Sequence, residues 1–109
     1  MEKEKSPFIR LFGDYPAVRV IDFLITYRDF DYPLKHIAES SDVAWSTIHS
    51  IFPNLISTGI VKQTRKIGRA KLYKLNTNNP IVKELISLDD KLIRELAHLI
   101  TEKEPCPSP

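Results

Sequence analysis

Apolar residues recur every three or four positions over most of the chain, which is the spacing of amphipathic helices. The pattern predicts four helices, at about 16–28, 34–40, 44–58 and 80–101. Pro16 and Pro80 stand where the first and last of them begin, a position that favours proline. Asn79 is a suitable cap for the last helix, and Gly59 is expected to end the third. An apolar cluster at 8–12 is too short to be a stable helix alone, so we expect it to dock on the rest of the chain.

Two strands are expected between the third and fourth helices, over residues 60–65 and 70–75. They are joined by residues 66–69, a tip in which Gly68 can adopt a positive φ. Residues 30–32 are expected to be extended, and to form a short edge strand, because Pro33 disfavours the helical conformation at the residue before it. With 109 residues, the chain is long enough for one domain, of the α+β class but mostly helical.

The segment 37–51, IAESSDVAWSTIHSI, has the pattern of a helix-turn-helix. The two helices of this motif cross closely, which requires a small residue in the first helix, and Ala38 meets that requirement. The turn requires a buried apolar residue, for which Val43 is suitable. Ile48 and Ile51 then supply the inner face of the second helix. In such a motif the second helix is the one that enters the major groove of DNA.

Positive charge is concentrated just downstream, in residues 62–74. These thirteen residues contain no acidic side chain and six basic ones, namely Lys62, Arg65, Lys66, Arg69, Lys71 and Lys74. The remainder of the chain has 10 Lys and Arg against 14 Asp and Glu, so it is slightly acidic. A basic hairpin on a near-neutral body favours a phosphate backbone as partner, because Lys and Arg displace the counterions condensed there. The alternative is a hairpin whose charges are only solvated.

The residues expected to contact DNA come from three segments. They are Lys35, then Trp45, Ser46, Thr47, His49 and Ser50 of the third helix, and Arg65, Lys66, Arg69 and Lys71 of the hairpin. Hydroxyls and the imidazole suit bases or phosphates, and an indole can lie along a sugar-phosphate wall. Each group also has an alternative interpretation, since Trp45 could belong to the core, Ser46 and Thr47 could cap the helix, and Lys35 could be solvated.

This order of elements resembles the winged helix-turn-helix family, in particular its small archaeal transcriptional regulators. The segments that carry the resemblance are IAESSDVAWSTIHSI, LISTGIVK and RKIGRAKLYKLN, within residues 15–76 and more weakly within 8–100. The resemblance implies a three-helix core with a β-hairpin wing and an extra C-terminal helix. It further implies sequence-specific binding of double-stranded DNA by a transcriptional regulator. The expected cytoplasmic location follows from the single cysteine, Cys106, which excludes an intramolecular disulfide framework.

Three residues depart from the family pattern. Asp42 occupies a turn position that is often Gly, and Asp tolerates the left-handed conformation needed there. Ser41 stands at a position that is usually apolar. Pro53 lies inside the third helix, where proline removes a hydrogen bond and clashes with the preceding turn. We therefore expect a kink at Pro53, or a helix that ends near Phe52 and restarts.

The last helix has two apolar rows, more than one small domain needs to cover. The expected cover is a second subunit, which makes the protein a homodimer. The interface is expected to contain Phe8, Leu85, Leu88, Leu92, Leu96 and Leu99. The alternative is that the helix folds back on its own domain. The expected organisation is thus an arm (1–14), the winged domain (15–76), a dimerisation helix (79–101) and a flexible tail (102–109).

Other functional classes find little support in the sequence. The three histidines lack metal-ligand spacing, no nucleophile–base set can be assembled, and no phosphate-binding glycine loop is present. We therefore expect no enzyme activity, cofactor, metal or evident small-molecule ligand, and Asp89 and Asp90 are expected on a solvated face. The sequence also lacks an apolar run long enough to cross a membrane. Two functional alternatives stay open, a winged-helix protein-interaction module and non-regulatory DNA binding in partition, replication or chromatin architecture.

Overall fold

The structure is a computed structural model that describes residues 5–101, with side chains described for residues 5–96. Over this range the chain forms five helices and three strands, a winged helix-turn-helix fold. The elements are α1 (Pro7–Phe12), α2 (Pro16–Thr26), β1 (Tyr32–Pro33), α3 (Leu34–Ser40), α4 (Trp45–Ser57), β2 (Val61–Ile67), β3 (Ala70–Leu75) and α5 (Pro80–Thr101). The predicted tail at 102–109 lies outside the described residues.

Helix boundaries follow the sequence signals closely. α2 and α5 begin at their prolines, and the side chain of Asn79 accepts a hydrogen bond from the Ile81 amide at 2.8 Å. Gly59 follows the end of α4 with a φ of 81°. Of the two arrangements expected at Pro53, a helix that ends near Phe52 and restarts is not found, since α4 continues through Pro53 to Ser57.

The helix-turn-helix consists of α3, a turn at residues 41–44 and α4. Ala38, Val43 and Ile48 are all buried, as the motif requires. The Val43 amide donates a hydrogen bond to the Ala38 carbonyl at 2.9 Å, which closes the turn. Asp42 has a φ of 57°, the left-handed conformation expected of it. The conformation of this turn thus fixes where α4 begins, and its first residues, Trp45 and Ser46, lie at the protein surface.

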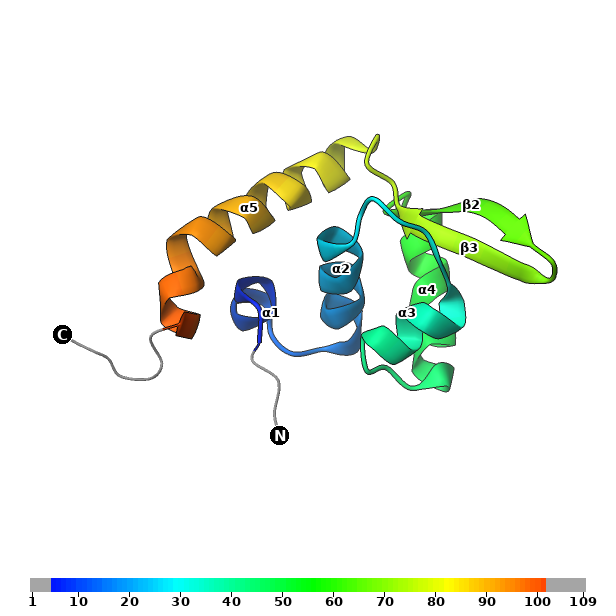
Figure 1. The fold of residues 1–109 in the computed structure, drawn as a ribbon, viewed down its shortest axis with the longest axis horizontal. Helices are drawn as coiled ribbons and strands as arrows, with labels where there is room; N and C mark the ends of the chain where they lie inside the picture. Colours follow the sequence, from blue (N-terminus) through cyan, green and yellow to red (C-terminus); the bar gives the residue numbers. More distant parts are fainter. Residues whose placement is uncertain (1–4, 102–109) are drawn as a thin grey trace.

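The three strands form one antiparallel sheet in the order β1-β3-β2. The edge strand is confirmed, although it covers residues 32–33 and not 30–32. β2 is two residues longer than predicted at its C-terminal end, so the tip of the wing shrinks to Gly68 and Arg69. Gly68 has a φ of 62° at the first central position, where a two-residue type II′ turn favours Gly. The wing, β2 and β3, projects from one end of the molecule beside α4 (Figure 1).

α5 lies along the body from the base of the wing to α1, which packs against it (Figure 1). The predicted interface row on α5 faces this body. Leu92 is buried in the core, as is Phe8 of α1, and three further members pack partly buried against it, namely Leu85, Leu88 and Leu96. The side chain of Leu99 lies outside the described part of the chain. The row therefore stabilises its own domain, which was the alternative arrangement.

Asp89 also differs from the expectation of a solvated face, because its side chain is buried with only 5% of the residue exposed. Asp90 beside it is partly exposed. Burial and the neighbouring Asp90 charge raise the pKa of Asp89, while Arg28 opposes this shift. The two neighbouring aspartates thus differ, since Asp89 is buried and Asp90 is partly exposed.

Candidate nucleic-acid interface

The first two turns of α4 present polar side chains to solvent. Ile48, Phe52 and Leu55 take the inner face at helical spacing and are buried, which fixes the rotation of the helix. The opposite face then exposes four of the five predicted contact residues of this helix, Trp45, Ser46, His49 and Ser50, while Thr47 is half-buried. The N-cap, Ala44, makes no side-chain cap hydrogen bond, which leaves amide groups of the first turn open to an acceptor.

Trp45 belongs to this exposed face and not to the core. As a residue it is 52% exposed. Its ring packs edge-on against the imidazole of His49, with ring centroids 4.4 Å apart and planes at 88°. These residues are four apart on α4, so the helix itself sets this contact. The contact holds a large apolar surface in place at the position that enters the groove in helix-turn-helix proteins.

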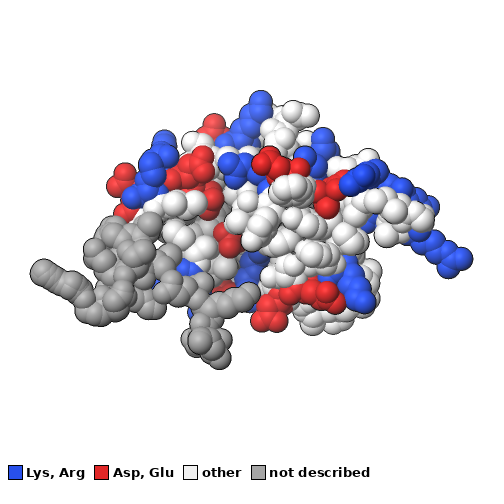
Figure 2. Space-filling view, viewed as in Figure 1, with Lys and Arg blue, Asp and Glu red and all other residues white. Residues whose placement is uncertain are grey.

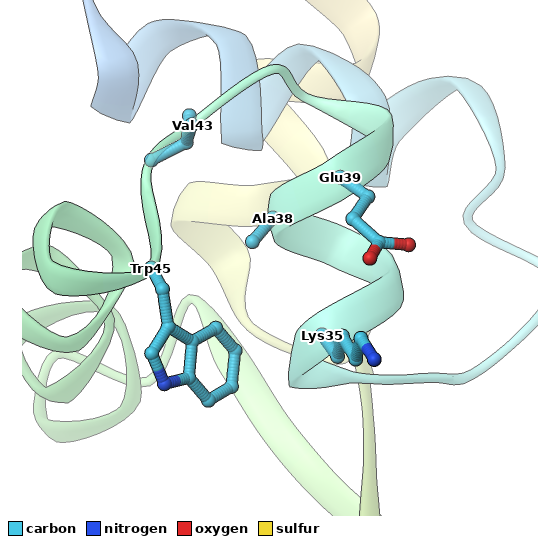
Figure 3. A pocket seen from close by; sticks show the side chains of 5 residues that line it. All are labelled: Lys35, Ala38, Glu39, Val43 and Trp45. Carbon is cyan, nitrogen blue, oxygen red and sulfur yellow. The ribbon is translucent and has the colours of Figure 1, made fainter.

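A shallow cavity of about 370 Å³ lies between the start of α4 and α3. It is lined by Lys35, Ala38, Glu39, Val43 and Trp45. The Trp45 indole extends from α4 toward α3, whose outer surface carries Lys35 and Glu39 (Figure 3). The structure thus brings Lys35, predicted as a phosphate contact, to the same cavity as Trp45.

The wing carries the positive charge that the sequence predicted. In Figure 2 the basic side chains extend along the hairpin and beyond it. Lys66, Arg69 and Lys71 are exposed, and none of them forms an ion pair with the residues described. Their charges are therefore available to an external anion.

Arg65 differs from the other wing cations because it is paired inside the protein. Its Nε lies 3.0 Å from Asp31 Oδ2 and its Nη2 lies 3.1 Å from Asp31 Oδ1. The Thr64 hydroxyl donates to the same carboxylate. Hydrogen bonds from Arg65 and Thr64 lower the pKa of Asp31 to about 2, so the pair is fully charged near neutral pH.

A second arginine, Arg19 of α2, positions the helix-turn-helix. Its Nε donates to the Ser41 carbonyl at 2.9 Å and its Nη2 to the Asp42 carbonyl at 3.0 Å. Its Nη1 contacts Asp14 Oδ1 at 2.9 Å. Arg19 therefore ties the turn before α4 to α2, and so fixes where the helix starts.

Sequence reasoning missed both Asp31 and Arg19. The contacts of Arg19 with the turn and of Asp31 with Arg65 join residues 22 to 34 positions apart, beyond the reach of any helical or strand spacing. The only signal present was compositional, an acidic residue close before a proline and a basic one in an apolar helix. Neither indicates which residue it will meet.

The part of the chain that the structure describes contains neither a candidate metal centre nor a candidate membrane span. Within residues 5–101 no three His, Cys, Asp or Glu side chains gather as a metal site would require. Nor does any helix of this range combine the length and apolarity needed to cross a bilayer.

Comparison with known structures supports the fold. A mutant of ZitR from Lactococcus lactis, in its apo form, has a similar structure, with a TM-score of 0.60 and 18% sequence identity. The similarity covers 86% of this chain and 74% of that one. No protein-family model and no curated protein matches the sequence. The winged-helix fold is therefore shared with ZitR.

Proposed function

We propose that the protein binds double-stranded DNA through α4 and the wing, as a sequence-specific transcriptional regulator. The observation that carries this proposal is the pairing of two surfaces in one winged helix-turn-helix. One is the exposed polar start of α4, and the other is a hairpin with unpaired cations at Lys66, Arg69 and Lys71 among the described residues. The first has the size and chemistry to enter a major groove, and the second suits the adjacent phosphates.

The predicted contacts divide into those that read bases and those that hold the backbone. Ser46, Thr47, His49 and Ser50 would face the major groove, where hydroxyl and imidazole groups can hydrogen-bond to base edges. Trp45 would lie along the sugar-phosphate wall. Lys35 and the wing cations Lys66, Arg69 and Lys71 would contact phosphates and supply most of the affinity. Arg65 has the same charge, but its pairing with Asp31 changes its role.

We further propose that the protein acts as a homodimer through α1 and α5. The inward row of α5 covers the domain's own core, so the interface would use the apolar side chains that remain outside. They include Leu11 and Phe12 of α1 and Ile93 of α5, whereas Ile81, which is also exposed, lies in the first turn of α5 and is not part of the proposed interface. α1 packs against α5, so these residues belong to one packed pair of helices. A two-fold dimer would present two α4 helices about 34 Å apart, and would favour an inverted-repeat site.

Fluorescence anisotropy with random duplex DNA and with genomic fragments, at several salt concentrations, tests the proposal. The expected result is salt-steep binding in which some fragments bind far more tightly than random DNA. Arg69→Ala should weaken binding similarly on all sequences and lower the salt slope by about 1, because one phosphate contact is lost. The matched control is Lys91→Ala, which removes an exposed cation from the C-terminal half of α5, far along the helix from the base of the wing. Absence of binding at low salt would refute the proposal.

A protein-interaction module is the second candidate, and Trp45 is the observation that favours it. An exposed indole beside a cavity can anchor a partner's side chain. This alternative predicts that Trp45→Ala abolishes partner binding, while duplex DNA shows no strong, salt-dependent binding to the protein. Equal, salt-steep binding to every duplex would instead indicate partition, replication or an architectural role.

A further inference from the structure

Three donors converge on the carboxylate of Asp31, in the loop between α2 and β1. Arg65 supplies two of them in a bidentate arrangement, at 3.0 and 3.1 Å, and the Thr64 hydroxyl supplies the third. A guanidinium fork with an added hydroxyl is the donor set that proteins use for phosphate as well as for carboxylate. We refer to Asp31, Thr64 and Arg65 as the wing clamp.

An irregularity in β2 makes the clamp possible. In a regular strand, neighbouring side chains point to opposite faces of the sheet, so Thr64 and Arg65 could not reach one carboxylate. The pairing with β3 shifts between Gln63 and Arg65, which leaves Thr64 as an extra residue. Such a bulge bends the strand and redirects its side chains. Both donors consequently meet Asp31.

The clamp also joins the two outer strands of the sheet. Asp31 directly precedes β1, whereas Thr64 and Arg65 belong to β2, and β3 lies between these strands. The Asp31 side chain is only 16% exposed, while that of Arg65 is 63% exposed. The carboxylate is therefore held in the protein, and the guanidinium covers it from the solvent side.

We propose that Asp31 takes the place of a DNA phosphate in this clamp, withholding Arg65 from DNA and fixing the base of the wing. This inference rests on the proposed DNA-binding function. An arginine whose charge is already matched by a carboxylate releases no counterion when the protein binds. Arg65 is thus a positioning residue, and Lys66, Arg69 and Lys71 make the phosphate contacts of the wing.

The salt dependence of binding to random duplex DNA separates this role from direct contact. Arg65→Ala should leave the salt slope unchanged. Asp31→Asn and Asp31→Ala should steepen it by about 1, because Arg65 is freed to contact a phosphate. Over a fourfold rise in salt, this corresponds to a roughly fourfold greater loss of affinity than in the wild type. The Asp31→Ala/Arg65→Ala double variant should return to the wild-type slope. A simple loss of wing structure could weaken binding but would not produce a steeper slope.

Two controls accompany these variants. Asp29→Asn changes the net charge by the same amount in the same loop, but Asp29 is exposed and has no hydrogen bond or ion pair with the described residues. It should therefore leave the slope unchanged. Arg69→Ala should lower the slope by about 1 in both the wild type and the Asp31→Asn background.

An NMR titration of the Asp31 carboxyl provides a readout that does not depend on DNA. Its pKa should be about 2 in the wild type and should rise toward 3.8 in Arg65→Ala. A wild-type value near 3.8 would overturn the clamp itself. A slope lowered by about 1 in Arg65→Ala would overturn the withholding of Arg65. If no variant, nor the wild type, binds duplex DNA, the DNA-binding proposal fails, and the titration alone then decides whether the clamp forms.

Discussion

Single side chains set the geometry of the helix-turn-helix turn. Arg19 binds the carbonyls of Ser41 and Asp42, so the turn is held from the side of α2. Ser41 is itself buried, with 5% of the residue exposed, and its hydroxyl has no hydrogen-bond partner among the described residues. A buried hydroxyl without a partner costs roughly 1–3 kcal/mol relative to a paired one. The Ser41 carbonyl therefore helps to hold the turn, whereas its unpaired hydroxyl destabilises the folded state.

Removing this hydroxyl is expected to stabilise the protein. Ser41→Ala should raise the free energy of unfolding by about 1 kcal/mol, because the desolvated group is lost and the methyl group stays packed. Urea denaturation measures the change, with Ser40→Ala as the matched control, since Ser40 is exposed and should shift stability by less than about 0.5 kcal/mol. A loss of stability in Ser41→Ala would mean that the hydroxyl has a partner in solution.

At the scale of elements, α4 is notable for accommodating a proline. Pro53 has no amide hydrogen to donate to the carbonyl of His49, yet the helix runs without interruption from Trp45 to Ser57. The reason lies in its inner face, since Ile48, Phe52 and Leu55 are buried on both sides of the proline. Packing of this face outweighs the lost hydrogen bond. The exposed turns that would contact DNA precede Pro53.

Pro53→Ala should therefore stabilise the protein, by about 1–2 kcal/mol. The restored hydrogen bond and the relieved clash are worth up to about 3 kcal/mol, and part of this is offset because proline also restricts the unfolded chain. Thermal unfolding followed by circular dichroism measures the effect. Asn54→Ala at the neighbouring exposed position is the control, with an expected gain below about 1 kcal/mol. A destabilised Pro53→Ala would indicate that the core requires the helix shape that proline imposes.

In α5, the buried Asp89 makes the stability of the fold depend on pH, in the sense opposite to Asp31. Burial and Asp90 raise the pKa of Asp89, and burial together with the Asp89 charge raises the pKa of Asp22, while the Ser6 hydroxyl opposes that shift. A carboxyl whose pKa is raised on folding binds its proton more tightly in the folded state. Its contribution to stability is consequently lost as pH rises above 3.8 through the raised pKa. Asp31 has the opposite sign, because its stabilising effect is lost as pH falls from 3.8 toward about 2.

Asp89→Asn should raise stability at pH 7, on the order of 1 kcal/mol, because a neutral amide is easier to bury than a carboxylate. It should also flatten the decline in stability on the alkaline side of pH 3.8. Denaturation across a pH series measures both effects. Glu84→Gln on the exposed face of α5 is the control and should change neither. An Asp89→Asn variant with the wild-type pH profile would mean that Asp89 is solvated in solution.

At the scale of the whole molecule, the wing lies toward one end, and α1 with the C-terminal part of α5 lies toward the other (Figure 1). The molecule is elongated, with principal extents of 54 × 32 × 21 Å. Assembly through α1 and α5 would therefore leave α4 and the wing of each subunit free for DNA. This arrangement supports the placement of the dimer interface at that end.

The dimer proposal predicts that Ile93→Asp produces a monomer. Ile93 is 46% exposed, and a charge there would be buried without a partner in the interface. Light scattering should give a mass of about twice the 12.6-kDa chain for the wild type and the single-chain mass for the variant. Ile81→Asp, at the other end of the same helix, is the matched control and should remain dimeric. A wild type that is monomeric at high concentration would refute the dimer, without bearing on the fold.

The sequence by itself determined the elements, because their signals are local. Pro16, Gly59, Asn79 and Pro80 marked helix ends, and the spacing of Ala38, Val43 and Ile48 predicted the helix-turn-helix. A hairpin rich in basic residues was likewise evident. Helix periodicity also showed that α5 has two apolar rows, but it could not show which row faces the domain.

Only the tertiary structure decided which of these groups meet. The inward row of α5, the burial of Asp89 and the pairing of Arg65 with Asp31 depend on how segments distant in sequence come together. Periodicity constrains neighbours within a helix or strand, whereas Asp31 and Arg65 are 34 positions apart. Their contact also depends on a one-residue shift in strand pairing, which no local pattern encodes. For this reason the six basic residues of the wing look equivalent in the sequence, whereas in the structure Arg65 is the one that forms an ion pair with a described residue.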